Sequence, residues 1–188
     1  MFNSINQLVE RAVKEDISIS EVMIQQEMEN TGQSYLDVYN LMKINLETME
    51  NAVKEGIEGV NSTTGLTGMD AVKMAKYIES GRGLSGELNL LAIQNAISTN
   101  EVNAAMGKIC ATPTAGSAGV VPGVLFAMVQ KDPSITEEQK VRFLFTSGAF
   151  GFVVANNASI SGAAGGCQAE VGSATAMAAA ALVELAGG

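Results

Sequence analysis

Residues 34–53 read Ser-Tyr-Leu-Asp-Val-Tyr-Asn-Leu-Met-Lys-Ile-Asn-Leu-Glu-Thr-Met-Glu-Asn-Ala-Val, and this stretch decides the fold class. Its apolar side chains recur every three or four positions, the spacing of one helix face. The members of that face are Leu36, Tyr39, Met42, Leu46, Met49 and Val53. Ser34 with Asp37 is an acidic variant of a capping box, so the pattern predicts a helix of about 22 residues after Ser34.

Similar signals surround this helix on both sides. Start signals occur at Ser4, at Ser18 with Glu21, at Asp70, and at Thr136 with Gln139. The first of these precedes an apolar face made of Ile5, Leu8, Val9, Ala12 and Val13. Further helices are expected over 87–106, with Leu88, Leu91, Ala92, Ala96 and Val102 on the apolar face, and over 168–186. No alternating β-branched run bounded by turns is present. We therefore expect an all-α, multi-helix bundle whose glycine-rich loops form a pocket.

Composition changes near residue 56. Residues 1–55 hold 14 charged residues and one glycine, whereas residues 56–188 hold 17 charged residues and 19 glycines. This change predicts amphipathic helices over 1–55 and a glycine-rich helical region over 56–188, or else one continuous domain. The glycine-rich part is expected to begin with a loop from Gly56 to Gly68.

The charge of the chain limits its partners. The net charge is −9, with 20 acidic and 11 basic residues, and no basic stripe suits nucleic acid or an anionic membrane. No signal-peptide pattern opens the chain, which favours the cytoplasm. Two cysteines 57 positions apart are then expected to be free thiols or metal ligands. Histidine is absent, so a general base must be Lys, Asp, Glu or Cys, or must come from another chain.

Cys167 has two interpretations. It follows two glycines at the start of a predicted helix, where a thiolate is stabilised and a cofactor can approach the backbone. It can equally be a small buried cysteine between helices, since neither cysteine belongs to a C-x-x-C pair. Cys110 is open to the same two interpretations, and packing is the commoner one.

Polar residues near the two cysteines are further candidates. Residues 111–123 place threonines and glycines before an apolar run, a loop entering a helix N-terminus that would suit a carboxylate. Asn156, Asn157, Ser159 and Ser161 can bind an amine or carboxylate, or can cap helix ends. Glu170 is a candidate acid or base, or a first-turn glutamate favoured by the helix dipole.

The end of the chain is almost uncharged. After Arg142, only Glu170 and Glu184 carry charge among 46 residues. A solvated helix would carry a polar face, so this stretch is expected to be buried. Little sequence remains to cover it, which favours a fragment over a chain covered by a partner.

Two long runs carry a family resemblance. They are Cys-Ala-Thr-Pro-Thr-Ala-Gly-Ser-Ala-Gly-Val-Val-Pro-Gly (110–123) and Asn-Asn-Ala-Ser-Ile-Ser-Gly-Ala-Ala-Gly-Gly-Cys-Gln-Ala-Glu-Val-Gly-Ser-Ala (156–174). They resemble iron–sulfur L-serine dehydratases, most closely the α chain of the two-chain form. The resemblance extends to residues 99–107, to Thr64-Gly65-Leu66-Thr67-Gly68 and to the N-terminal helices, and so covers essentially the whole chain.

The resemblance implies a cofactor and its ligands. The family binds a [4Fe–4S] cluster through three cysteines, and Cys167 matches the first. The other two are expected beyond Gly188, so the 188-residue chain by itself is expected to hold no stable cluster and to be inactive. Ser117 stands where some single-chain relatives carry cysteine and is not expected to be a ligand. No pyridoxal phosphate is implied.

The resemblance also implies a reaction and a partner. A β chain with a serine- and histidine-containing motif would complete the site, and L-serine would be converted to pyruvate and ammonia. Residues expected to contact the substrate are Asn100, Asn103, Thr112, Thr114, Gly116, Ser117, Asn157, Ser159 and Ser161. The alternatives are a related iron–sulfur lyase, such as one that desulfidates L-cysteine, and an all-helical assembly subunit without chemistry of its own.

Overall fold

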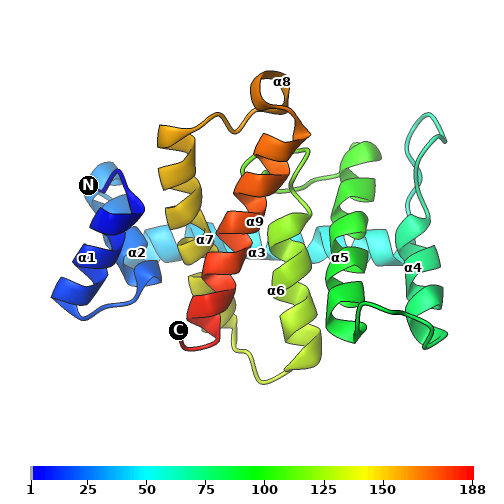
Figure 1. Ribbon diagram of the computed structural model, residues 1–188, viewed down its shortest axis with the longest axis horizontal. Coiled ribbons are helices and arrows are strands. Elements are labelled where there is room, and N and C mark those ends of the chain that lie inside the picture. Colours follow the sequence, from blue (N-terminus) through cyan, green and yellow to red (C-terminus); the bar gives the residue numbers. More distant parts are fainter. Residues whose placement is uncertain (1) are drawn as a thin grey trace. The chain divides into compact units, whose positions relative to one another are not determined.

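The computed structural model describes residues 2–188, and within them every regular element is a helix (Figure 1). The elements are α1 (Ile5–Glu15), α2 (Ile19–Thr31), α3 (Tyr35–Glu58), α4 (Asp70–Glu79), α5 (Glu87–Ala104), α6 (Val120–Lys131), α7 (Glu137–Asn157), α8 (Gly162–Gly165) and α9 (Cys167–Leu185). The only extended pairing in the described part is an isolated antiparallel bridge between Asn61 and Gly68. The all-α prediction is confirmed.

The helix α3 begins where its capping signal predicts. The Ser34 hydroxyl accepts the Asp37 N–H at 3.3 Å, and the Asp37 carboxylate accepts the Ser34 N–H at 3.2 Å. The apolar face is buried at Leu46, Met49 and Val53, but Leu36 is 68% exposed. The prediction that Leu36 lies on the buried face is wrong. In the first turn of α3, the buried apolar side chain is that of Val38.

The chain forms two compact units that both use α3. One unit comprises residues 1–46 and 136–188, and the other comprises residues 47–135. The compositional change near residue 56 falls inside the second unit. The change in composition therefore does not coincide with the boundary between the two units.

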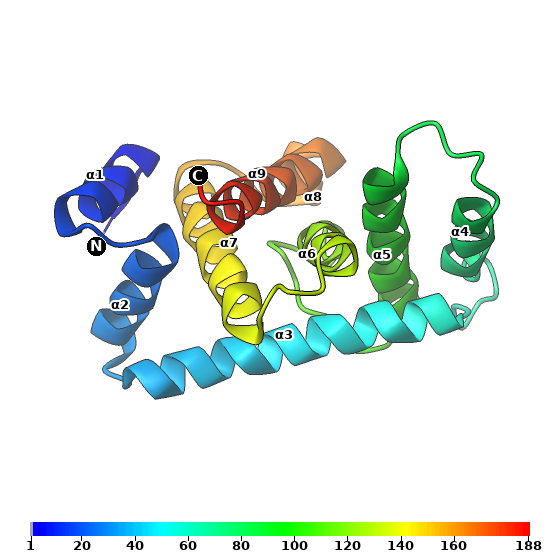
Figure 2. The same cartoon turned by 90° about the horizontal axis from the view of Figure 1, so that it is seen from below.

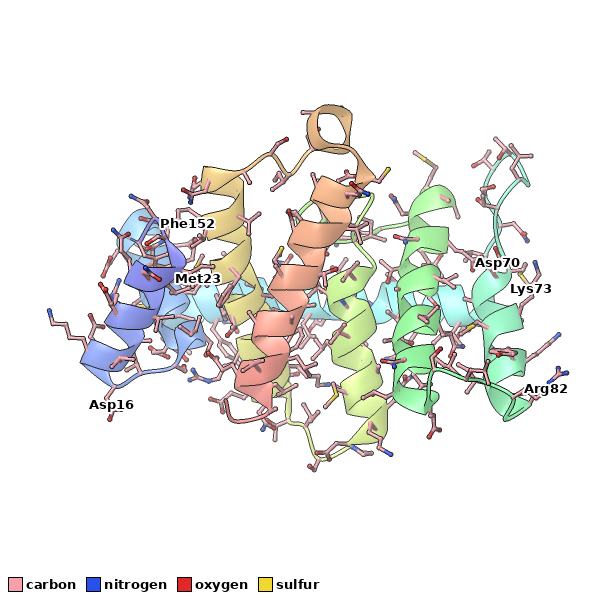
Figure 3. The ribbon with its side chains drawn as sticks, viewed as in Figure 1. Asp16, Met23, Asp70, Lys73, Arg82 and Phe152 are labelled. Carbon is pink, nitrogen blue, oxygen red and sulfur yellow. The ribbon has the colours of Figure 1, made fainter. Side chains whose placement is uncertain are left out.

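In the first unit, α7 packs against α2 and α9, as Figures 1 and 2 both show. Thr136 and Gln139 form the predicted capping box of α7. Phe145 of α7 is 1% exposed, and the rings of Phe2 and Phe152 meet edge to face with centroids 5.6 Å apart (Figure 3). These contacts build one core from the first and last segments of the sequence.

Two apolar faces predicted to be buried are partly open. In α1, which packs mainly against α2, Leu8 and Ala12 are buried, whereas Ile5, Val9 and Val13 are exposed. In α9, Ser173, Ala174, Met177, Ala178 and Ala181 face the core. The opposite face stays exposed, with Val183 at 58%. The prediction that the uncharged C-terminal stretch is buried throughout is wrong, because α7 covers only one side of α9 within this unit.

Glu184 ties α9 to the start of α2. Its carboxylate accepts the N–H groups of Ile19 and Ser20 at 2.9 and 3.3 Å, and the Thr146 hydroxyl at 2.7 Å. Free N–H groups at a helix start favour an anion, so this acid serves as a cap donated by another helix. These bonds give a structural role to Glu184, one of the two charged residues after Arg142.

In the second unit, α5 packs between α4 and α6 and buries polar side chains. These buried polar side chains are Gln94, Asn95, Ser98, Thr99 and Glu101. Leu88, predicted to be buried, is 38% exposed because the buried face of α5 is this polar one. Asp70 is the first residue of α4 and does not cap it, contrary to prediction. The residue before it, Met69, has a φ of 64° and makes no side-chain cap.

Gly56 lies inside α3 and not at the start of a loop, contrary to prediction. A Cβ at this position would lie 2.5 Å from the Cα of Ser98 on α5. Glycine is therefore used here for close approach of two helix backbones. The loop begins only after Glu58.

Met106 lies just after α5 with a φ of 66°, a conformation that favours glycine. The Gly107 N–H donates to the Val102 carbonyl at 2.8 Å, as in a Schellman motif. A left-handed non-glycine residue costs about 1–2 kcal/mol, so we expect Met106→Gly to raise the free energy of unfolding by about 1 kcal/mol. Urea denaturation measures this. Ala105→Gly, one position earlier at a φ of −82°, should lower it instead; equal effects of both changes would contradict the explanation.

Candidate functional site

Cys167 is the first residue of α9 and its side chain is exposed. Gly166, which precedes it, has a φ of 77°, a conformation open to glycine and strained for other residues. The thiol borders a shallow depression of about 500 Å³, lined by Cys167, Gln168, Val171, Gly172 and Thr175. The structure therefore does not bear out the interpretation of Cys167 as a buried packing residue.

Glu170 lies one turn further along α9. A Cβ on Gly162 would lie 2.5 Å from a carboxylate oxygen of Glu170, so this side chain folds over the short helix α8. A Cβ on Gly165 would similarly lie 2.6 Å from the Cβ of Ala169. The glycines of this segment thus let α8 lie against the first turn of α9. Glu170 stays a candidate acid or base at the same end of α9 as Cys167.

The residues before α8 have different surroundings. Asn157 donates from its amide to the carbonyls of Asn3 and Val153, both at 2.8 Å, and so closes the end of α7. Ser161 accepts the Ala163 N–H at 3.2 Å and caps α8. Ser159 is exposed, and its hydroxyl oxygen would lie 3.6 Å from a Cβ on Gly165. Ser159 is therefore the best placed of the three to contact a ligand near Cys167.

The second unit holds the other group of candidates, in the loop of residues 110–119. Its polar groups largely bind each other. The Ser117 hydroxyl, which is buried, donates to the Thr112 carbonyl at 3.0 Å and lies 3.1 Å from the Thr114 hydroxyl. Thr112 is also buried and donates to the Ala118 carbonyl at 3.4 Å. These bonds shape the loop ahead of α6, and they leave the exposed backbone at Gly116 as its open part.

Of the two candidate asparagines on α5, one binds this loop. The Asn103 amide donates to the Ala115 carbonyl at 3.3 Å, whereas Asn100 is exposed. The structure thus brings Asn103 and the loop of residues 110–119 together in one unit. The other unit contains Asn157, Ser159, Ser161, Cys167 and Glu170.

An iron–sulfur cluster fits Cys167 as one ligand. Such clusters are held by cysteine thiolates, and this thiol is exposed beside glycines that leave room at the backbone. Within residues 2–188, however, no three His, Cys, Asp or Glu side chains form a group that could hold a metal ion. The chain accordingly offers one ligand and not a complete set.

Cys110 differs from Cys167 in its surroundings. It is half-buried, and burial raises the pKa of its thiol, although Lys108 and a hydrogen bond with Thr48 counteract this in part. It lies in the connection between α5 and α6.

We expect iodoacetamide to modify Cys167 at least about tenfold faster than Cys110 at neutral pH, because the thiolate is the nucleophile and Cys110 is shielded. A raised pKa leaves less thiolate at neutral pH, so the rate at Cys110 should keep rising as pH increases beyond the range of an ordinary thiol. Peptide mass spectrometry over a pH series measures both rates. Faster modification of Cys110 would contradict the structure.

Sequence reasoning missed the two acids that cap helices from a distance. Glu184 bridges α9 and α2, and Glu101 accepts two N–H groups at the start of α4. A signal existed for Glu184, an isolated charge in an apolar stretch. Nothing local marks Glu101, because its partners lie 30 and 31 positions away.

A separate observation concerns membranes. None of the helices formed by residues 2–188 combines the length and the apolar character needed to cross a bilayer.

The residues described above also match known proteins in sequence. The family described as "Serine dehydratase alpha chain" matches residues 14–188. The chain is 65% identical to the "Probable L-serine dehydratase, alpha chain" of Bacillus subtilis (strain 168), over all of this chain and 62% of that protein. It is 35% identical to the "L-serine dehydratase, alpha chain" of Peptoniphilus asaccharolyticus, over all of this chain and 64% of that protein.

A third relative has a longer chain. The "L-serine dehydratase TdcG" of Escherichia coli (strain K12) is 32% identical over all of this chain and 42% of that protein. The chain thus spans 62% and 64% of the length of the two α-chain relatives. The resemblance noted in the sequence is confirmed: the chain belongs to the serine dehydratase alpha chain family.

Proposed function

We propose that this chain forms part of the α chain of an L-serine dehydratase, which eliminates water from L-serine and releases pyruvate and ammonia. The observation that carries the proposal is the exposed Cys167 thiol at the start of α9, beside glycines and an open depression. The named relatives are L-serine dehydratases, and this is the segment in which a cofactor can approach the backbone.

The cofactor we propose is a [4Fe–4S] cluster with Cys167 as one ligand. When bound, it supplies a Lewis-acidic iron for the hydroxyl of serine, which is otherwise a poor leaving group. Membership of the family does not by itself identify the cofactor. Its support is the exposure of Cys167 and the cysteine chemistry of such clusters.

The chain's own residues would hold the substrate. In the unit of residues 47–135, the Asn100 amide and the backbone at Gly116 can bind a carboxylate or an ammonium group. In the other unit, the exposed Ser159 hydroxyl can bind either group. Thr112, Thr114, Ser117 and Asn103 would shape the loop that presents Gly116, and Asn157 and Ser161 would fix the turn that presents Ser159. Glu170 is the candidate in this chain for removing or delivering a proton.

We propose a β chain as the partner that completes the site. The chain has no histidine, so an imidazole base can come only from elsewhere. The names of two relatives contain the words "alpha chain", which supports the presence of a second kind of subunit. Both cysteines are thiols and not disulfide-bonded, which suits a reducing compartment, and we place the enzyme in the cytoplasm.

Anaerobic assays of an α chain that contains these residues, combined with a β chain and reconstituted with iron and sulfide, test the proposal. Pyruvate should form from L-serine faster than from L-cysteine. Faster release from L-cysteine would instead identify a desulfidase. No release from either, with no thiolate-to-iron absorption, would indicate an assembly subunit without chemistry.

A further inference from the structure

The carboxylate of Glu101 holds the start of α4. It is 6% exposed, and its two oxygens accept the N–H groups of Asp70 and Ala71 at 2.6 and 3.2 Å. Figure 3 labels Asp70 and Lys73 in this first turn of α4. The ordinary cap residue cannot serve, since Met69 makes no side-chain bond. An anion at a helix N-terminus is favoured by the free N–H groups and by the helix dipole.

A second side chain of α5 grips the same turn. The Gln94 amide donates to the Ala71 carbonyl at 3.4 Å. Gln94 and Glu101 are seven positions apart, two helical turns, and so lie on the same face of α5. Ala71, which is fully buried, is thus held at both its N–H and its carbonyl group.

Glu101 and Gln94 together form a clamp on the first turn of α4. This clamp fixes one end of a glycine-rich hairpin, residues 60–69. This hairpin is closed by the Asn61–Gly68 bridge and by bonds from Met69 N–H to the Val60 carbonyl at 3.0 Å and from Ser62 N–H to the Thr67 carbonyl at 2.8 Å. Its other end continues from α3, where Gly56 lies directly on the α5 backbone. Both ends are therefore anchored on α5, while the tip at Leu66 is 86% exposed.

The C-terminal end of α5 holds two loops together. Glu101 fixes the 60–69 hairpin, and Asn103, two positions later, donates to the loop of residues 110–119. Figure 1 shows the hairpin rising from the start of α4 at the same end of this unit as the end of α5. The hairpin carries the hydroxyls of Ser62 and Thr64, and the exposed candidates on α5 and in the loop of residues 110–119 are Asn100 and Gly116.

We propose that Glu101 is a positioning residue: it holds the 60–69 hairpin as one wall of the substrate site formed with Asn100 and the loop of residues 110–119. The clamp itself stands on the hydrogen bonds alone, and the substrate wall rests on the proposed function. Glutamine at this position has one acceptor oxygen for two N–H donors and turns its own N–H₂ group toward one of them. The hairpin would then lose its fixed base while the α5 helix persists.

Hydrogen exchange in the 188-residue chain tests the clamp. Glu101→Gln should speed exchange of the Asp70, Ala71 and Met69 amides at least about tenfold, with α6 amides unchanged. Glu87→Gln, an exposed acid at the other end of α5, is the matched control and should change nothing. If Glu101→Gln unfolds the unit, Gln94→Ala loosens the same turn from its carbonyl side and should give the same local pattern. Wild-type protection of these amides in both variants would overturn the clamp.

Kinetics test the substrate wall in the assembled dehydratase. Glu101→Gln should raise the KM for L-serine at least about fivefold with kcat changed less than twofold, because binding and not the chemical step is disturbed. An unchanged KM with faster local exchange would overturn the wall while keeping the clamp. If the wild-type assembly turns over no serine, the proposed function fails and the wall fails with it, whereas the exchange result in the 188-residue chain still decides the clamp.

Discussion

Replacing Cys167 with alanine is expected to lower pyruvate formation from L-serine by at least about 100-fold in an assembly that is active with the wild-type chain, more than the 10–100-fold typical of removing a metal site's outer contacts. The reason is the loss, from the exposed start of α9, of the thiolate that we propose as a cluster ligand. Iron content and the thiolate-to-iron absorption should fall together with activity. Anaerobic assay and iron analysis of the same samples measure all three.

Cys110→Ala is the matched control for this prediction. Cys110 belongs to the other unit, is half-buried, and has a pKa raised by burial, which is unlike a ligating thiol. We expect this variant to retain iron and most of its activity. Normal turnover by the Cys167 variant, or equal loss in both variants, would refute the assignment of Cys167.

Gly56→Ala is expected to lower the free energy of unfolding by about 2–3 kcal/mol, the cost of overpacking when backbone must move. The added Cβ would lie 2.5 Å from the Cα of Ser98, which belongs to the backbone of α5 and cannot rotate away. The helices α3 and α5 must therefore separate. Urea denaturation gives the free energy, and hydrogen exchange of α5 amides shows whether the loss is local to this contact.

Gly148→Ala provides the control for Gly56→Ala. Gly148 also lies inside a helix, α7, and no atom lies within 4 Å of the place where its Cβ would be. Alanine should stabilise the protein there by about 0.5–1 kcal/mol, because glycine costs that much inside a helix. A loss of stability of similar size in both variants would contradict the role given to Gly56.

The helices were predictable because their signals are local. The capping pairs Ser34 with Asp37 and Thr136 with Gln139 lie within one turn, and both form the predicted bonds. Gly56 was misplaced for the opposite reason. Glycine usually marks a loop, and only the tertiary contact with Ser98, 42 positions away, shows why a helix contains one here.

The candidate site was predictable in part. Cys167 begins a helix after a glycine with positive φ, as the sequence pattern indicates. Which faces are buried was harder to foresee. The α5 helix buries Gln94 and Glu101 because their partners on α4 satisfy them, and hydrophobic periodicity cannot report such pairs. Similarly, exposure of Val183 depends on what covers α9 and not on the helix itself.

The most direct test of the central claim is the spectrum and activity of one anaerobic sample: an α chain containing these 188 residues, assembled with a β chain and reconstituted with iron and sulfide. The account predicts thiolate-to-iron absorption and pyruvate formation from L-serine, both lost in the Cys167→Ala variant and both kept in the Cys110→Ala variant. Pyruvate formation at the wild-type rate by the Cys167→Ala variant, without that absorption, would contradict it.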